Sequence, residues 1–206
     1  MIEHMRKLRD LVHLIFAILL VWIYVPHIIL YMFCPKMREL VNADMEEYKK
    51  RIKLSLCNTL SFIYHVHNNR FFRVVFYHRA GPIFTFLFGW YRPGDKYFVI
   101  SKTSKIGKGF HCLHPYSTII NAESIGENFS CHHLVTIGYK NDITPERPVI
   151  GNNVCVGANV IIIGSITVGN NVTIGAGSVV INNVPDNCVV AGNPAKVVKK
   201  LGGNVL

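Results

Sequence analysis

Residues 148–180 read PVIGNNVCVGANVIIIGSITVGNNVTIGAGSVV, and this stretch decides the fold. An aliphatic residue recurs every six positions, four times followed by glycine: Ile150-Gly151, Val156-Gly157, Ile162, Val168-Gly169, Ile174-Gly175 and Val180. Each unit of six supplies a short strand and a turn, and three units close one triangular coil with the aliphatic residues inside. Stacked coils bury a continuous core that no single unit can bury. The stretch therefore predicts a mainly β protein, a parallel β-helix.

The same pattern extends towards the N-terminus. Aliphatic-glycine pairs occur at Ile106-Gly107, Ile125-Gly126 and Ile137-Gly138. The repeat accounts for a domain over 96–206 with about four to five coils. The remaining chain divides into a hydrophobic segment over 1–35 and a helical region over 36–95.

Inward positions can be assigned face by face. Cys112, Ile119 and Ile125 are expected on successive faces, with one extra residue between the first two. Cys131 then lies under Cys112, and Ile137 lies under Ile119. Residues 139–148 break the period and are expected to leave as a loop, after which Ile150 follows Ile137; Val156 and Ile174 then share the face of Cys112.

Two residues beyond each position on the Cys112 face come His114, His133, Ala158 and Ala176. This spacing predicts one column, with imidazoles at one end and methyl groups at the other. Coils repeat at about 4.8 Å, so His114 is expected roughly 14 Å from Ala176. Small side chains leave the backbone open to an extended ligand. The alternative is that alanine is merely tolerated at a corner.

Four pieces of sequence carry a family resemblance: KIGKGFHCLHPYSTIINAESIG (105–126), VTIG (135–138), the stretch 148–180, and VPDNCVVAGNPAKVVK (184–199). Together they resemble the hexapeptide-repeat acyltransferases, in particular the serine acetyltransferase branch with its relatives that O-acetylate sugars of polysaccharides. The resemblance implies a left-handed coil, acetyl-CoA as cosubstrate, and a homotrimer whose active sites lie between adjacent β-helices.

The resemblance also implies a set of site residues. His114 matches the family's general base, which accepts the proton of the acceptor hydroxyl; a plain surface histidine is the alternative. His133, Gly138 and Arg147 are expected at the acceptor or thioester end, where the Gly138 amide could stabilise the oxyanion. Gly138, Ala158, Ala176 and Lys196 are expected to bind the cofactor, with Lys196 near its phosphates. Lys199 and Lys200 fit phosphate contact and a solvated tail equally well.

Three departures from the serine acetyltransferase pattern concern the acceptor. The aspartate before the catalytic histidine is Leu113, the second family aspartate is Val99, and the loop's Arg-His pair is Glu146-Arg147. A buried amino acid would lack charged partners here. We therefore expect acetylation of a sugar hydroxyl in a surface-glycan precursor. The alternatives are a serine O-acetyltransferase of cysteine biosynthesis and an inactive trimeric scaffold.

Metal and nucleic-acid sites are not expected. His111, His114, His132 and His133 do not have the spacing of the zinc-dependent relatives of this fold. The 206 residues carry a formal charge of +10, but no basic run with interleaved aromatics forms a nucleic-acid motif. The six cysteines have no CxxC spacing and read as small buried hydrophobes.

Residues 11–33 contain no charged side chain. This length can cross a bilayer, although a buried helix of a trimer core would look similar. Basic residues flank both ends, so a helix that bends near Pro26 and returns to one side satisfies the positive-inside rule. This predicts a bacterial protein at the cytoplasmic face of the membrane. Helices are expected over 44–64 and 68–91, with Arg70, Arg73 and Arg79 lining a face that suits a membrane surface or a helical collar.

Overall fold

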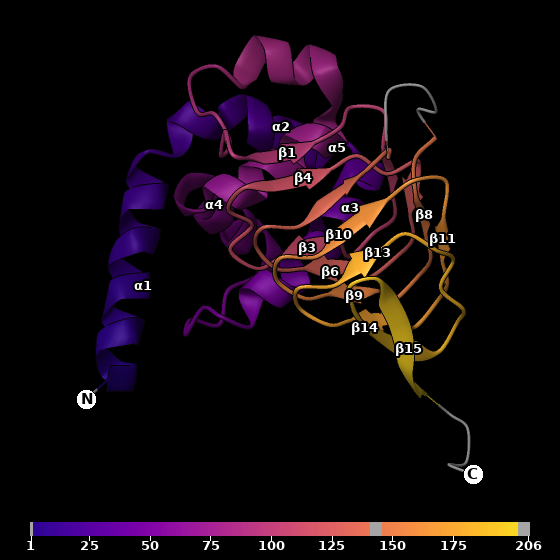
Figure 1. The fold of residues 1–206 in the computed structure, drawn as a ribbon. Coiled ribbons are helices and arrows are strands. Elements are labelled where there is room, and N and C mark those ends of the chain that lie inside the picture. The colour runs from indigo at the N-terminus through magenta and orange to yellow at the C-terminus, as the bar shows by residue number, and fades with distance from the viewer. Residues whose placement is uncertain (1, 141–145, 202–206) are drawn as a thin grey trace. The chain divides into compact units, whose positions relative to one another are not determined.

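The computed structural model describes residues 2–140 and 146–201 and divides into two compact units between Asp95 and Lys96 (Figure 1). The first unit is helical, and the second is a stack of short strands. Each is described by itself below.

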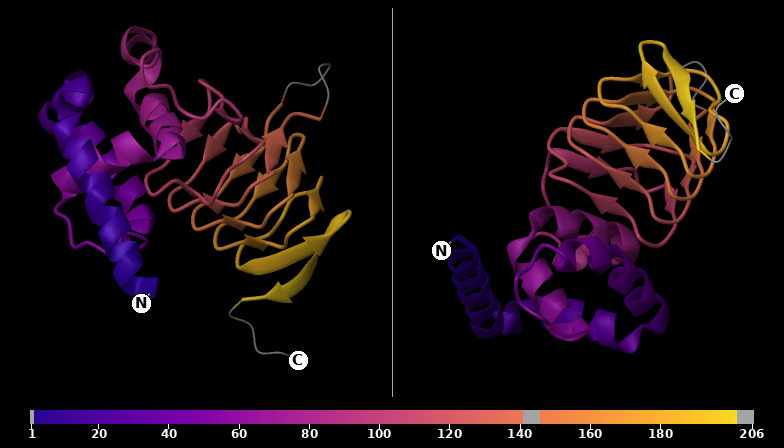
Figure 2. Two further views of the ribbon diagram at one scale, coloured as in Figure 1. Left: turned by 90° about the vertical axis from the view of Figure 1, so that its left-hand side faces the viewer. Right: turned by 90° about the horizontal axis from the view of Figure 1, so that it is seen from below.

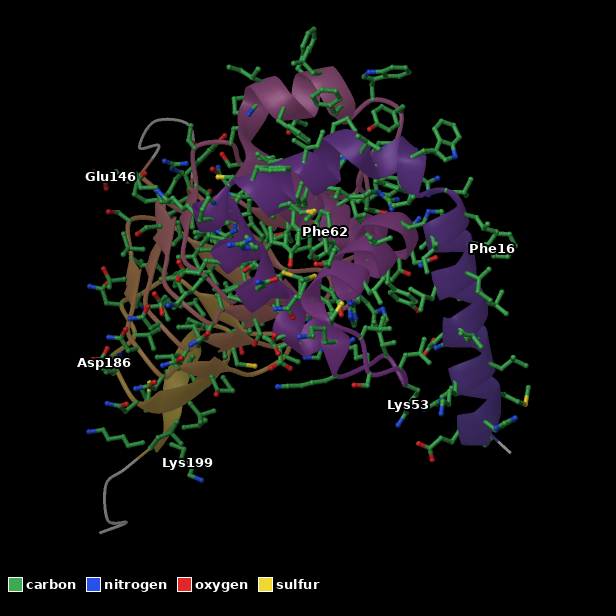
Figure 3. The ribbon with its side chains drawn as sticks, turned by 180° about the vertical axis from the view of Figure 1, so that it is seen from behind. Phe16, Lys53, Phe62, Glu146, Asp186 and Lys199 are labelled. Carbon is green, nitrogen blue, oxygen red and sulfur yellow. The ribbon has the colours of Figure 1, made fainter. Side chains whose placement is uncertain are left out.

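The N-terminal unit packs its helices around an aromatic core. The helices are α1 (Ile2–Leu19), the 3-10 turn η1 (Val21–Tyr24), α2 (Val25–Phe33), α3 (Pro35–Lys49), α4 (Asn58–Asn68) and α5 (Arg70–Phe88). The Tyr31 and Phe62 rings stack at 4.3 Å between centroids. Figure 3 shows Phe62 inside this group of helices. Aromatic side chains of α2, α4 and α5 thus pack with Met37, Val41 and Met45 of α3 in one core.

The apolar segment breaks at Leu20, which corrects the expected bend near Pro26. Pro26 lies in the first turn of α2, where its missing N–H leaves no hydrogen bond unmade. No single helix in the described residues has both the length and the apolar composition of a membrane span. Only the pair Ile2–Leu19 and Val21–Phe33, bent by 68°, meets both conditions together.

The helix expected over 44–64 is also wrong, because α3 ends at Lys49 and α4 begins at Asn58. The intervening chain approaches α1, where the Lys53 amide donates to the buried Asp10 carboxylate at 3.0 Å. Four basic residues at 49, 50, 51 and 53 also repel one another in a continued helix. The buried carboxylate thus holds the interruption in place.

Helix α5 starts where Asn69 caps it and turns at Gly81. The Asn69 side chain accepts from the amides of Phe71 and Phe72 at 3.0 and 3.1 Å. Gly81 has φ +85°, which interrupts the helix before Pro82. The expected element over 68–91 is therefore two helical pieces.

The arginines of α5 do not form the predicted basic face. Arg73 is buried and donates to the carbonyls of Val66 and Pro93, and its burial lowers its pKa. Arg79 forms a buried ion pair with Asp44 at 3.0 Å. These two cations stabilise the interior of the helical unit, so the basic helix surface proposed from sequence is not present there.

The C-terminal unit is a parallel β-helix with three sheets (Figure 2). Its strands are β1 (Phe98–Ile100), β2 (Lys105–Ile106), β3 (His111–Cys112), β4 (Thr118–Ile120), β5 (Ser124–Ile125), β6 (Ser130–Cys131), β7 (Thr136–Gly138), β8 (Val149–Ile150), β9 (Cys155–Val156), β10 (Ile161–Ile163), β11 (Thr167–Val168), β12 (Thr173–Ile174), β13 (Val179–Val180), β14 (Cys188–Gly192) and β15 (Ala195–Lys200). Sheet A contains β1, β4, β7, β10 and β13; sheet B contains β2, β5, β8 and β11; sheet C contains β3, β6, β9, β12, β14 and β15. The order gives about five coils and confirms the predicted fold class apart from its membrane-associated part.

One corner explains the Gly-Asn-Asn pattern of the sequence. A Cβ on Gly126 would lie 2.7 Å from the Gly151 backbone, so no side chain fits between these coils. Asn153, Asn171 and Asn187 have positive φ and hydrogen-bond one another along the stack, Asn153 to Asn171 at 2.9 Å and Asn171 to Asn187 at 2.8 Å. The corner is thus held by close backbone contact and an asparagine ladder.

The inward assignments are confirmed with one exception. Cys112, Cys131, Val156 and Ile174 are buried and in register on sheet C. On sheet A, however, Ile120 pairs with Ile137, while Ile119 is 47% exposed. The first coil contains two extra residues before this strand, one more than expected. The six-residue period cannot reveal the length of an insertion at a corner.

The interruption at 139–148 lies between β7 and β8. Residues 141–145 of it lie outside the described part of the chain. Strand β8 then returns to sheet B, where Ile150 pairs with Ile125. This confirms that Ile150 follows Ile137 as the next inward position.

Buried His65 predicts a pH-dependent loss of stability. Burial lowers its pKa to about 4, with a smaller contribution from Lys49, whereas the unfolded chain titrates near its ordinary value of 6.5. Between these values the unfolded state binds the extra proton, so stability falls as pH drops from 6.5 to 4, by on the order of 2–3 kcal/mol. Urea unfolding should show a shallower fall for His65→Phe. The exposed His4→Phe serves as control and should keep the wild-type slope; equal slopes in all three proteins would contradict the assignment.

Candidate active site

The predicted column lies at the corner where the chain passes from sheet C to sheet A. The Asn159 amide donates to the His133 carbonyl at 3.0 Å, and the Gly177 amide donates to the Ala158 carbonyl at 2.9 Å. These bonds place His133, Ala158 and Ala176 in register on three successive coils. Ala158 is half-buried and Ala176 is exposed, so their methyl groups line an open edge.

His114 occupies the same corner on the first coil, where the two extra residues widen the turn. The Leu113 amide donates to the Cys131 carbonyl at 2.7 Å, which places His114 beside His133. The next ladder bond runs from Leu134 to the Tyr116 carbonyl, so the turn bulges between them. His114 has φ 48° and an exposed side chain. Within 2–140 and 146–201, its imidazole makes no hydrogen bond to another side chain.

The far end of the column reaches the C-terminal hairpin. Ile174 pairs with Val190, so Gly192 follows Ala176 as the next position of the column. Lys196 lies on β15 opposite Ala191 and is exposed. Lys199 lies further along the same strand, and Figure 3 shows it near the end of the β-helix. The edge therefore runs from two imidazoles, past two small residues, to an ammonium group.

Gly138 and Arg147 lie at a different corner, between sheets A and B. Gly138 follows His133 by five positions along one coil, roughly 16 Å in extended chain. Gly138 is paired with Ile163 in sheet A. Within one chain, these two residues and the histidines therefore occupy opposite edges of sheet A. A single chain does not bring the predicted site together.

Arg147 belongs to a polar cluster that the sequence did not reveal. Its guanidinium pairs with the Glu123 carboxylate and donates to Thr103 Oγ1 at 2.6 Å and to Asn121 Oδ1 at 3.3 Å. Thr103, Asn121 and Glu123 occupy the same corner on the two preceding coils. The repeat register could have placed them together, but only the structure shows that Glu123 neutralises the arginine.

The outer face of sheet A is mostly apolar. Val99, Ile119, Thr136, Ile161 and Val179 form a continuous row across its five strands. Val99, Ile119 and Ile161 are exposed. This row lies between the histidine edge and the Arg147 edge, so any partner that covers it also approaches both edges.

The histidines near the first corner do not form a metal centre in the described residues, where no group of three or more His, Cys, Asp or Glu side chains is arranged to hold an ion. All six cysteines are free thiols, and Cys112 and Cys131 are buried, as the inward positions require. The expectation that all six are buried is wrong for Cys57 and Cys155, which are exposed, and for Cys34, which is half-buried.

The repeat region of this chain is similar to known proteins. Residues 147–182 match the family model "Bacterial transferase hexapeptide (six repeats)". Residues 147–182 therefore carry the repeat of the hexapeptide transferases. Over 99 residues, 48% of this chain and 61% of the relative, it is 48% identical to WcaB of Escherichia coli K12, which is named a colanic acid biosynthesis acetyltransferase. The chain thus spans less than two thirds of this hexapeptide-repeat relative.

Serine acetyltransferases are also similar. Serine acetyltransferase 2 of Arabidopsis thaliana is 38% identical over 104 residues, which cover 50% of this chain and 32% of that protein. The crystal structure of serine acetyltransferase from Neisseria gonorrhoeae matches with a TM-score of 0.63 and 26% identity, covering 82% of this chain and 67% of that one. The coils thus match the left-handed β-helix of the serine acetyltransferases.

The column geometry predicts opposite outcomes for two neighbouring substitutions. Ala176→Trp should leave the melting temperature unchanged, because its side chain points to solvent. Gly157→Ala should destabilise the protein by about 1–3 kcal/mol, because its Cβ would lie 2.6 Å from the Ala176 amide nitrogen. Thermal unfolding of both variants tests the register. A stable Gly157→Ala together with an unfolded Ala176→Trp would show that the faces are assigned wrongly.

Proposed function

We propose that this protein transfers an acetyl group from acetyl-CoA to a sugar hydroxyl of a surface-glycan precursor, with His114 as general base. The observation that carries the proposal is the open column of His133, Ala158 and Ala176, beside His114 at one end and ending near Lys196 at the other. Its small side chains expose backbone to an extended thioester arm. The Lys196 ammonium suits the phosphates of the nucleotide end.

A homotrimer would complete the site. Three β-helices that cover the apolar outer faces of sheet A around a threefold axis place the histidine edge of one copy beside the Arg147 edge of the next. His114 and His133 would then meet Gly138 and Arg147 of a neighbouring copy. This arrangement explains why one chain separates residues that the family pattern groups together.

The proposed chemistry is direct transfer. The His114 imidazole accepts the hydroxyl proton as the sugar oxygen attacks the thioester carbonyl carbon. The tetrahedral intermediate then collapses, the carbon–sulfur bond breaks, and the CoA thiolate takes the proton from the His114 imidazolium, which regenerates the base. A backbone amide at the subunit boundary, with that of Gly138 as the candidate, stabilises the oxyanion.

A neutral acceptor fits the proposed site, which both edges form together, better than an amino acid does. Glu123 already neutralises Arg147, so no unpaired cation awaits a carboxylate there. Leu113, half-buried beside His114, cannot pair with an ammonium. Thr103 and Asn121 add the hydroxyl and amide groups that recognise sugar hydroxyls. The similarity to WcaB over 99 residues supports an acceptor of the same class.

Serine O-acetylation is the second candidate, favoured by the structural match that extends over 82% of this chain. Mass spectrometry of products formed from acetyl-CoA and a panel of lipid-linked sugars, nucleotide sugars and L-serine separates the two. An acetylated sugar supports the proposal, and turnover of serine alone contradicts it. Absence of any acetylated product, with intact trimer and CoA binding, would identify the inactive scaffold instead.

His114→Ala should lower turnover by about two to four orders of magnitude, the usual contribution of a general base. Acetyl-CoA should still bind, because the alanine column is unchanged. Steady-state rates and calorimetric CoA binding measure both effects. His132→Ala provides a neighbouring control and should retain most activity. An activity of His114→Ala within a few-fold of wild type would remove His114 from the mechanism.

Lys196→Ala should raise the Michaelis constant for acetyl-CoA and leave turnover nearly unchanged, because a phosphate contact is equal in the ground and transition states. The effect should shrink as salt increases. Kinetics at two ionic strengths test this, with Lys108→Ala, an exposed lysine on an early coil, as control. A change in turnover without a change in the Michaelis constant would place Lys196 outside the cofactor site.

A further inference from the structure

Two segments of the helical unit lack any Asp, Glu, Lys or Arg: residues 11–35 and residues 80–91. Both expose large apolar side chains. Phe86 is 81% exposed, Trp90 76% and Trp22 68%. The others in this group are Leu11, Val12, Ile15, Phe16, Ile18, Leu19, Val25, Ile29, Met32, Phe33, Ile83 and Leu87. We call this set the charge-free surface. Its exposed apolar area is larger than the single exposed apolar residues that are normal on a soluble protein.

The two segments lie side by side although they are distant in sequence. The Tyr91 hydroxyl donates to the Ile23 carbonyl at 2.8 Å. Trp22, Pro26, Leu87 and Trp90 line one shallow apolar groove. The turn at Gly81 changes the direction of α5, and the chain after it lies beside residues 22–26. The charge-free surface is therefore a single feature with a fixed backbone, made from both ends of the helical unit.

Helix α1 leaves most of its large apolar side chains exposed. Its buried residues are Asp10, Leu14 and Ala17, and the Asp10 carboxylate accepts from the Lys53 amide at 3.0 Å. The exposed apolar side chains point away from the unit, as Figure 3 shows for Phe16. Contact of this apolar area with water is unfavourable, and its transfer into hydrocarbon would be favourable.

We propose that the charge-free surface inserts into one leaflet of an anionic lipid bilayer and holds the protein there without spanning it. Exposed basic residues border the surface at both ends, Arg6, Lys7 and Arg9 before it and Lys36 and Arg38 after it. Anionic headgroups complement them, as those of the cytoplasmic leaflet would. Tryptophan is the side chain typical of the headgroup boundary. The 68° bend between α1 and η1–α2 allows both basic borders to lie on the same side of a membrane.

The membrane fits this surface better than a second copy of the chain does. A twofold contact through the charge-free surface would bring each basic border against charges of its own sign or against apolar side chains. A bilayer instead has hydrocarbon for the apolar side chains and, next to it, anionic headgroups for the basic residues at the borders. The proposal does not depend on the acetyl-transfer reaction, although it would place a lipid-linked acceptor within reach.

The chain carries its own probes, because Trp22 and Trp90 are its two tryptophans and both lie on the charge-free surface. Full-length protein is mixed with vesicles of phosphatidylcholine containing about one third phosphatidylglycerol, and with phosphatidylcholine alone. We expect a blue shift of the tryptophan emission, quenching by lipids brominated on the acyl chains, and tighter binding to the anionic vesicles. Emission and quenching unchanged on addition of anionic vesicles would overturn the proposal.

Paired variants identify the surface responsible. Phe86→Ser combined with Ile83→Ser should lower the vesicle partition coefficient at least about ten-fold, while circular dichroism stays unchanged, because both side chains are exposed. Ile181→Ser combined with Val198→Ser removes exposed apolar groups from the β-helix and should bind as wild type does. Equal binding by all proteins would overturn the assignment. So would a concentration-dependent oligomer, seen without vesicles and lost in Phe86→Ser, because it would identify a second copy as the occupant.

Discussion

The close approach of successive coils at the Gly-Asn-Asn corner is the constraint on which the β-helical unit depends. A Cβ on Gly151 would meet the Gly169 backbone at 2.8 Å, so the spacing of the stack is set by backbone contact. The asparagine ladder then satisfies polar groups that the turns leave unpaired. A stack held in this way has fixed register, and fixed register places residues from distant coils in straight columns.

Those columns give the edges of the β-helix their chemistry. One edge carries His133, Ala158 and Ala176 at the spacing of the coils, and the opposite edge carries Arg147 with its partners. The mostly apolar row of sheet A lies between them. The separation of the two edges within one chain, and the exposed His114, make the proposed trimer a requirement for activity under this account.

The sequence was most informative where the period is unbroken. The six-residue repeat predicted the inward positions of sheet C, because one aliphatic residue per unit must be buried. It misplaced Ile119, because a two-residue insertion at a corner leaves the neighbouring strands intact. In the helical unit there is no period to follow: the inward turn of Arg73 and Arg79 depends on carbonyls and a carboxylate supplied by other segments. The pairing of Arg147 with Glu123 could not be predicted either, because the partner comes from another coil.

The site residues could likewise be placed from the sequence only where the six-residue repeat is unbroken. His114, Ala158 and Ala176 could be assigned to one corner by counting, whereas the wider turn around His114 could not. Pro26 was expected to bend its helix, yet it lies in the first turn of α2, where a proline is tolerated, and the break at Leu20 precedes it.

A crystal structure of the protein with bound acetyl-CoA tests the central claim most directly. The account predicts a trimer in which the thioester arm follows the edge of Ala158 and Ala176, with its carbonyl beside His114 and within reach of Gly138 from a neighbouring copy. A cofactor bound along another edge, or a carbonyl remote from His114, would contradict it.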